Sequence, residues 1–139
     1  MTKGKWAVRL KPDDAEAHYN LGAAYGELGR YQEAIAEYRE ALRLKPDYAE
    51  AHYNLGVAYG KLDRYQEAIA EYREALRLKP DHANARNNLG VAYGALGRYQ
   101  EAIAEFKEAL RLKPDLAEAH LGLGITYLTL GDRGAALEE

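Results

Sequence analysis

The chain has 139 residues, of which 47% are apolar, and its formal net charge is −3. This length corresponds to about one domain with enough apolar residues for a core, and the negative charge argues against the phosphate attraction on which nucleic-acid binding depends. The absence of cysteine excludes disulfides, thiolate metal sites and thiol nucleophiles. No apolar run follows the early lysines, and the longest uncharged apolar stretch, 121–131, is too short to span a bilayer. We therefore expect a cytoplasmic protein that binds neither nucleic acid nor a membrane.

The sequence repeats itself with a constant period. Pro12, Pro46, Pro80 and Pro114 mark this period at equal intervals, and each is followed by Asp. The stretch YQEAIAEYREALRLKP occupies 31–46, returns unchanged at 65–80, and recurs at 99–114 with two substitutions. A fixed period of roughly 34 residues is typical of helical solenoids, in which each repeat packs on its neighbours. The chain therefore divides, within one domain, into a fragment (1–14), three complete repeats (15–48, 49–82 and 83–116) and a partial fourth (117–139).

Each repeat predicts two helices. The apolar residues recur at helical spacing in both halves of the first repeat: Leu21, Tyr25 and Leu28, then Ala34, Tyr38, Ala41 and Leu42. Between the two halves stands Gly29, Gly97 or Gly131, and Asp63 holds the same place in the second repeat. Glycine readily adopts the left-handed conformation that follows a helix C-terminus. We therefore expect a helix to end at each of these positions, so that 117–130 is a first helix and the residues after it begin a second.

The junctions between repeats predict helix caps. Pro46 cannot extend the helix before it, and Asp47 with Glu50 forms the pattern of a capping box for the next helix. In the third repeat Asp81 is followed by Asn84 in place of Glu. We expect the first helix of that repeat to fray more at its start.

The segment 18–46 resembles a tetratricopeptide repeat. The family pattern is Trp-x2-Leu-Gly-x2-Tyr, then Ala-x3-Phe, then Pro, and it is matched by Leu21, Gly22, Tyr25, Ala34, Tyr38 and Pro46. The Trp position departs from the pattern, since His18, His52, Arg86 and His120 occupy it. The resemblance implies an all-α fold, a right-handed superhelical solenoid of antiparallel helix pairs. Small residues such as Gly22 should let the paired helices approach closely.

The resemblance also implies a peptide groove on the concave surface, lined mainly by first helices. In the family a ladder of asparagines holds the peptide main chain, although these residues could instead bond to their own scaffold. The matching residues here are Asn20, Asn54 and Asn88. Around them we expect Tyr19, Tyr53 and Asn87 at one position, Val57 and Val91 at another, and Glu16, Glu50 and Lys61 at the rim. The tyrosines could anchor a peptide or pack between repeats.

The charge of this lining favours a neutral or basic extended segment. Three glutamates, at 16, 50 and 118, outnumber Lys61 and Arg86. Family members that bind chaperones clamp an acidic C-terminus with Lys and Asn at positions matching Tyr19 and Ala23, so we do not expect that recognition here. Gly26, Gly60 and Gly94 occupy a position that usually carries a larger residue; they either widen the groove or, as we favour, relieve crowding between repeats.

The two ends of the chain predict head-to-tail association. Residues 1–11 align with the later part of a second helix, whereas 133–139 align with the beginning of one. The helix 117–130 is unusually apolar, and an uncovered face of that kind often binds a partner. The alternative is a terminal helix whose apolar face is tolerated. In a head-to-tail contact the N-terminal fragment of one molecule would cover this helix in the next, through Trp6, Val8 and Leu10 against Leu121, Leu123, Ile125 and Leu128.

No catalytic constellation is predicted. Equivalent histidines in successive repeats should lie on the order of 10 Å apart, whereas zinc needs its nitrogens at about 2.1 Å from one point. We expect no cofactor, no metal and no enzyme activity. Three hypotheses remain: a peptide-binding module, a natural or engineered scaffold without a ligand of its own, and a regulatory arm of a larger protein, suggested by the mid-helix stop at Glu139.

Overall fold

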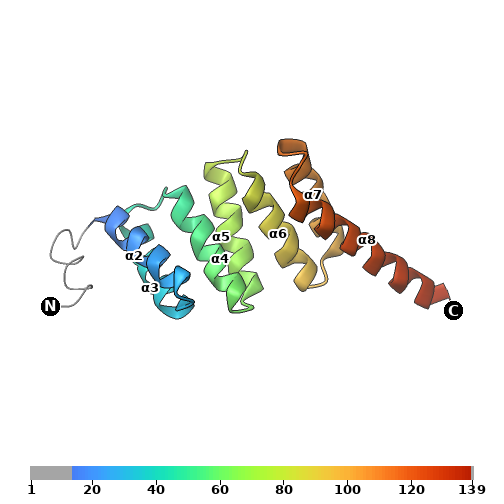
Figure 1. Ribbon diagram of the computed structural model, residues 1–139, viewed down its shortest axis with the longest axis horizontal. Coiled ribbons are helices and arrows are strands. Elements are labelled where there is room, and N and C mark those ends of the chain that lie inside the picture. The colour runs from blue at the N-terminus through green and yellow to red at the C-terminus, as the bar shows by residue number, and fades with distance from the viewer. Residues whose placement is uncertain (1–13, 139) are drawn as a thin grey trace. The chain divides into compact units, whose positions relative to one another are not determined.

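The computed structural model describes residues 14–138, and this part of the chain is all α-helical. The chain divides into two compact units, Met1–Leu78 and Lys79–Glu139. The predicted fragment 1–14, with Trp6, Val8 and Leu10, lies almost wholly outside the described residues. Figure 1 shows the helices, which are α2 (Ala15–Glu27), α3 (Tyr31–Leu44), α4 (Ala49–Lys61) and α5 (Tyr65–Leu78) in the first unit, and α6 (Ala83–Ala95), α7 (Tyr99–Leu112) and α8 (Ala117–Glu138) in the second.

Consecutive helices pack as the pairs that the repeat period predicts. The pairs are α2 with α3, α4 with α5, and α6 with α7. In the first unit α3 also contacts α4, and in the second α8 contacts both α7 and α6. Alanines on the second helices, such as Ala34 and Ala41, are fully buried between the paired helices. The all-α repeat fold predicted from the sequence is therefore confirmed.

A glycine against an aromatic ring sets the spacing of each pair. A Cβ atom built at Gly22 would lie 2.7 Å from a ring carbon of Tyr38. The same distance is 2.6 Å for Gly56 and Tyr72, and 2.8 Å for Gly90 and Phe106. Real Cβ atoms do not approach ring carbons this closely, so only glycine lets the ring lie directly on the first helix.

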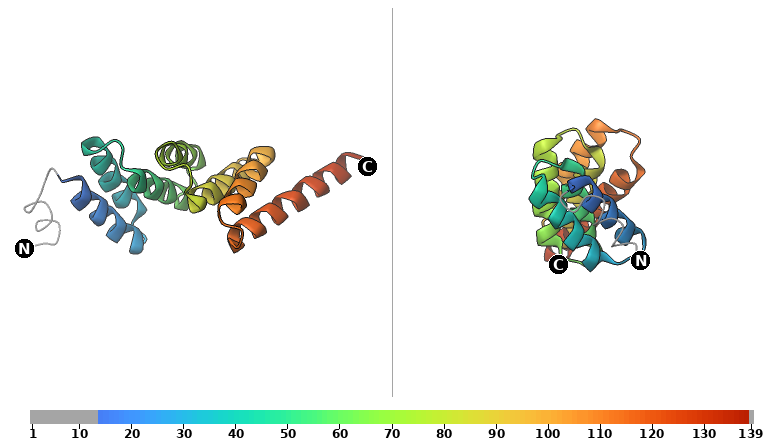
Figure 2. Two further views of the ribbon diagram at one scale, coloured as in Figure 1. Left: turned by 90° about the horizontal axis from the view of Figure 1, so that it is seen from above. Right: turned by 90° about the vertical axis from the view of Figure 1, so that its left-hand side faces the viewer.

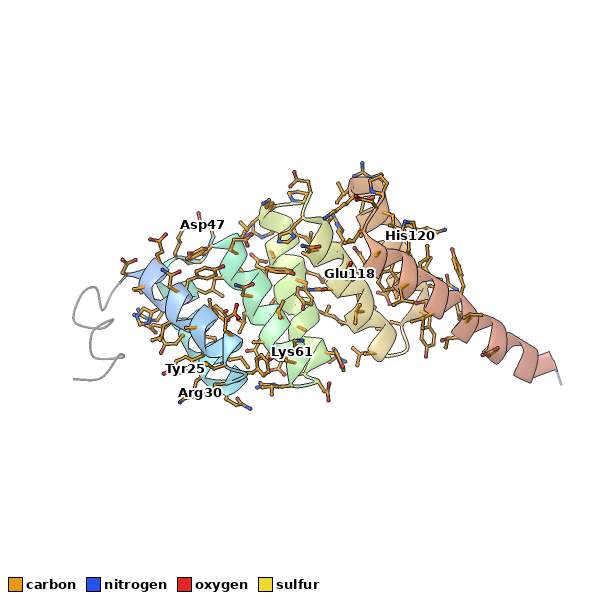
Figure 3. The ribbon with its side chains drawn as sticks, viewed as in Figure 1. Tyr25, Arg30, Asp47, Lys61, Glu118 and His120 are labelled. Atoms are coloured by element: carbon orange, nitrogen blue, oxygen red, sulfur yellow. The ribbon has the colours of Figure 1, made fainter. Side chains whose placement is uncertain are left out.

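The turns within the pairs adopt the left-handed conformation expected from the sequence. Gly29 has φ 73°, Gly97 has φ 78°, and Asp63, in the same place, has φ 59°. The next residue is an arginine that closes the turn in every pair. Arg30, labelled with Tyr25 in Figure 3, stacks its guanidinium 5.0 Å from the centre of the Tyr25 ring and pairs with Glu33.

Replacing Asp63 by glycine should stabilise the protein slightly. The left-handed conformation strains a residue that carries a Cβ, and glycine removes this strain. The substitution also removes the exposed hydrogen bond from the Tyr65 hydroxyl to Asp63 Oδ1, 2.9 Å long. We expect a net gain of about 0.5 kcal/mol in the free energy of unfolding. Thermal unfolding followed by circular dichroism would show it, and a lower melting temperature would contradict the expectation.

The helix starts differ from the capping boxes that the sequence predicted. The N-cap of α4 is Tyr48, one residue after Asp47, and its side chain makes no capping bond. The start of α6, which we expected to fray, is capped instead by His82, whose Nδ1 accepts from the Ala85 N–H at 3.1 Å. Pro46 and Asp47 form a turn in which the Tyr48 N–H donates to the Lys45 carbonyl at 3.2 Å, so the helix starts one residue later and the residue after the Asp is its N-cap.

The predicted break at Gly131 is absent, because α8 runs without interruption from Ala117 to Glu138. Figure 2 shows it continuing as one straight helix beyond α6 and α7. A turn at Gly131 would return the chain along α8 only if the following residues buried enough apolar surface there. The few residues after Gly131 in this chain form about two turns, and continuing the helix satisfies their backbone hydrogen bonds locally.

Candidate functional site

A groove of about 320 Å³ opens between α2, α3 and α4 of the first unit. Of the residues predicted to bind a peptide, it brings together Asn54, Val57 and Lys61. Figure 3 labels Lys61, which lies near the C-terminal end of α4. The full lining comprises Ala23, Gly26, Glu27, Tyr31, Tyr38, Asn54, Val57, Ala58 and Lys61.

Asn54 is anchored on its own scaffold and also faces the groove. Its Nδ2 donates to the Tyr19 hydroxyl at 3.0 Å, and the same amide lowers the pKa of Tyr38 slightly, as a donor to the Tyr38 oxygen does. Burial raises the pKa of Tyr38 to about 12, so this hydroxyl stays neutral near physiological pH. No described group hydrogen-bonds to Asn54 Oδ1. The tyrosines thus fix the amide and leave its carbonyl as an acceptor for a ligand N–H.

A change in the third and fourth repeats supports this pairing of Asn with Tyr. The ring of Tyr38 is replaced by Phe106, which has no hydroxyl. Asn54 follows Tyr38 by sixteen residues, and the residue that follows Phe106 by sixteen is Gly122. A Cβ at Gly122 would lie 2.5 Å from Phe106 Cζ. The hydroxyl and the amide that binds it are therefore lost together, and the ring packs on bare backbone instead.

Tyr19 and Tyr53 serve mainly to pack helices. The ring of Tyr19 lies 5.9 Å from that of Tyr38 and 4.9 Å from that of Tyr48, measured between ring centres. Tyr53 lies 6.0 Å from Tyr72. Neither Tyr19 nor Tyr53 lines the groove. Of the two interpretations of these tyrosines, packing is the one that their contacts favour.

The remaining asparagines differ among themselves. Asn20 is exposed on α2 and lies outside the groove lining, and Asn88 is half-buried on α6. Asn87, which we placed on the groove surface, is only 7% exposed. Its Nδ2 donates to Asn88 Oδ1 at 3.3 Å, and its own Oδ1 is buried without a partner. Tyr19 and Tyr53, at the same position in their helices, are partly buried.

The charges around the groove are only partly those predicted. The lining itself carries one acid, Glu27, and one base, Lys61. Glu16 and Glu50 are exposed at the starts of α2 and α4, outside the lining. There they reinforce the effect of burial, which raises the pKa of Tyr48. At that end Glu16 and Glu50 are accompanied by Lys45, whose ammonium lies 4.7 Å from the centre of the Tyr48 ring.

Gly26, Gly60 and Gly94 do not relieve crowding between repeats. A Cβ at Gly26 would lie 3.9 Å from the Tyr38 hydroxyl, an ordinary contact, and one at Gly94 would meet no described atom within 4 Å. The interpretation that we favoured from the sequence is wrong, and Gly26 lines the groove. Tyr31 also lines the groove, although it was not predicted to, because it begins a second helix and the expected lining came from first helices.

The residues at the family's Trp position bind an acid on the paired helix. His18 Nδ1 lies 2.7 Å from Glu37 Oε1, and His52 Nδ1 lies 2.8 Å from Glu71 Oε1. Arg86 donates to Glu105 at 3.1 Å, so it faces α7 and adds no charge to a groove. The recurrence of Glu nineteen residues after this position was a signal in the sequence. Among the described residues, no group of three or more His, Cys, Asp or Glu could hold a metal ion, and no helix is long and apolar enough to cross a membrane.

The melting temperature should fall as the pH rises through the titration of His52. Burial lowers the pKa of His52, but hydrogen bonds to the Glu71 carboxylate and the Pro46 carbonyl, with the nearby charge of Glu74, raise it by more. Since the net pKa is raised on folding, the protonated form stabilises the fold. The contribution of protonated His52 to stability is complete below about pH 6.5, the pKa of an unperturbed histidine. It is lost as the pH rises through the pKa of His52 in the folded protein.

The matched variant is His52→Arg, which copies Arg86 of the third repeat. Arginine stays charged throughout this range. The melting temperature of the variant should therefore change less between pH 6 and pH 8 than that of the wild type in the same buffers. Equal pH responses of the two proteins would contradict the assignment.

Comparison with known proteins agrees with this geometry. Family models match the chain over 5–29 and 26–63 (TPR repeat) and over 47–115 and 81–138 (Tetratricopeptide repeat). The chain belongs to the tetratricopeptide repeat family. No curated protein matches it significantly.

Several solved structures resemble the chain closely. The crystal structure of MamA superposes with a TM-score of 0.88 at 29% identity and covers 96% of this chain and 78% of that chain. The first TPR of Spaghetti (RPAP3), bound to the HSP90 peptide SRMEEVD, has a TM-score of 0.83 at 26% identity and covers 85% and 94%. The TPR domain of Arabidopsis OM64 has a TM-score of 0.79 at 27% identity and covers 81% and 93%.

Proposed function

We propose that this chain is a protein-interaction module whose first unit holds an extended peptide in the groove between α2, α3 and α4. The observation that carries the proposal is Asn54, whose amide nitrogen is fixed by the scaffold while its Oδ1 is left without a described partner at the groove. An extended peptide has main-chain N–H groups at regular spacing, which such an acceptor can bind. The structure of the first TPR of Spaghetti (RPAP3) with a bound HSP90 peptide supports a peptide as the kind of ligand.

The chemistry of the groove favours a neutral or basic segment. Val57, Ala23 and Ala58 offer a short apolar stretch, and Glu27 and Lys61 balance one another. The exposed carboxylates of Glu16 and Glu50, which outnumber Lys45 at that end, would attract a positively charged flank. Tyr19 and Ala23 stand where the chaperone-binding members carry Lys and Asn, so an acidic peptide such as SRMEEVD should bind poorly.

A peptide array of neutral, basic and acidic heptapeptides, followed by titration of the best binder, tests the proposal. Asn54→Ala should weaken that peptide about tenfold, the value of one hydrogen bond near 1.4 kcal/mol. Asn20→Ala is the matched control, because Asn20 has the same place in its helix but lies outside the groove lining. Since Asn54 also bonds Tyr19, melting curves must accompany the titration. No binder in the array, or equal losses for the two variants, would overturn the proposal.

The exposed face of α8 favours a second candidate function, head-to-tail assembly. Leu121, Ile125 and Leu128 are 64%, 52% and 69% exposed and follow one another along the helix. The predicted counterpart, Trp6, Val8 and Leu10, lies outside the described residues. Light scattering across a concentration series should show growing particles that Ile125→Glu abolishes. A strict monomer at all concentrations would contradict assembly.

A further inference from the structure

Helix α8 carries the surface on which a second helix packs, yet no described helix covers it. Gly124 lies three repeat periods after Gly22 and occupies the same place in its helix as Gly22, Gly56 and Gly90. Each of those three lies against an aromatic ring of its paired helix. A Cβ at Gly124 would meet no described atom within 4 Å. The position that elsewhere receives a ring is open.

The neighbours of Gly124 repeat this contrast. Tyr127 is 47% exposed, whereas its equivalents Tyr59 and Tyr93 are 6% and 5% exposed and Tyr25, at the first helix, is partly buried. The open face also includes Leu123, which is only partly buried. This face is distinct from the stripe formed by Leu121, Ile125 and Leu128.

A polar partner is missing at the same face. His120, labelled in Figure 3, makes the same backbone contact as His52: its Nε2 lies 2.8 Å from the Pro114 carbonyl, as that of His52 lies 2.9 Å from the Pro46 carbonyl. In His52 the other ring nitrogen bonds to Glu71 of the paired helix. Within the described part of the chain, His120 has no such carboxylate.

We propose that His120, Leu123, Gly124 and Tyr127, which we call the α8 seat, bind an amphipathic helix of a partner protein. The internal pairs define its chemistry. Their second helices share the pattern Ala-Ile-x-Glu-aromatic-x-x-Ala, as in 34–41, 68–75 and 102–109. The two alanines, the isoleucine and the aromatic residue are buried in each pair, and the glutamate binds the residue at the Trp position.

The complementarity is both steric and electrostatic. The aromatic ring fills the space above Gly124, and the glutamate before it meets His120. The residues of α8 after Gly131 do not compete for the seat, because they continue along the helix axis and away from it. A separate helix with this pattern is therefore the ligand that fits.

The test uses the full chain and a synthetic peptide with the sequence of α5, YQEAIAEYREALRL. Titration into isotopically labelled protein, followed by NMR, should shift the resonances of Gly124, Tyr127 and His120. A short peptide pays an ordering cost on binding, so millimolar peptide is required. No shift at that concentration, or shifts confined to the groove residues Asn54 and Lys61, would overturn the proposal.

Matched variants locate the site. Gly124→Val should weaken binding at least tenfold by filling the space for the ring, and Gly131→Val on the same helix should leave it unchanged. Both glycines lie in open surroundings, so both variants should keep their melting temperature. In the peptide, replacing the tyrosine that matches Tyr72 by alanine should abolish binding, and replacing the glutamate that matches Glu71 by glutamine should weaken it. Binding that ignores Gly124→Val or the tyrosine substitution would refute the seat.

Discussion

Gly56→Val is expected to lower the free energy of unfolding by about 3 kcal/mol. A Cβ at this position would lie 2.6 Å and 2.8 Å from two ring carbons of Tyr72, which is itself buried. The ring cannot move aside without opening the α4 and α5 pair, so the substitution forces the two helices apart. The higher helix propensity of valine offsets only a few tenths of a kcal/mol.

The matched control is Gly60→Val, which makes the same substitution one turn later on α4. A Cβ there would lie 3.8 Å from the Tyr72 hydroxyl, an ordinary contact. Urea unfolding followed by circular dichroism should give a much lower midpoint for Gly56→Val than for Gly60→Val. Similar midpoints would show that the glycine does not set the helix spacing.

Phe106→Ala should cost about 3 to 5 kcal/mol and should release α8 in particular. The Phe106 ring is 2% exposed and lies against two helices, since Cβ atoms at Gly90 and at Gly122 would both meet it within 2.8 Å. Its removal leaves a cavity that neither glycine can fill. Because α8 has no described second helix of its own, this ring is a principal attachment of α8 to α6 and α7.

Hydrogen exchange measured by mass spectrometry separates this local effect from a general loss of stability. Peptides from α8 should exchange much faster in Phe106→Ala, with a smaller change in α2 and α3. Lys107→Ala, which alters the exposed neighbour on the same helix, should leave exchange as it is in the wild type. Uniform acceleration along the whole chain would contradict the specific role of the ring.

The fold could be predicted from the sequence because its determinants are local and repeated. The constant period, the glycine at the place of Gly22 and the aromatic residue at the place of Tyr38 are all visible in the sequence, and together they specify one helix pair. The left-handed turns were predictable for the same reason, since Gly29 and Asp63 stand alone between two apolar patterns. The break at Gly131 was not, because a turn there depends on how much surface the following residues could bury.

The candidate site was predicted only in part. Asn54, Val57 and Lys61 line the groove, but Asn87 is buried, and its depth depends on the neighbouring helices, which no pattern within α6 reveals. The approach of Tyr31 from a second helix depends on how α3 lies beside α4, which no pattern within one helix reveals. The bonds between Asn54 and the two tyrosines likewise join residues of different repeats.

Phe106 replaces the tyrosine of Tyr38, and Gly122 replaces the asparagine of Asn54. This joint replacement restricts how such an array of repeats can grow by duplication. A repeat whose second helix carries tyrosine at the place of Tyr38 can be copied and inserted before any repeat that carries asparagine at the place of Asn54. A copy of 83–116 in the same place would set a phenylalanine ring, which has no hydroxyl, beside an asparagine, and the asparagine amide would lose the tyrosine oxygen that it faces. Recombination between repeats should therefore preserve the last two as a unit, while the earlier ones remain interchangeable.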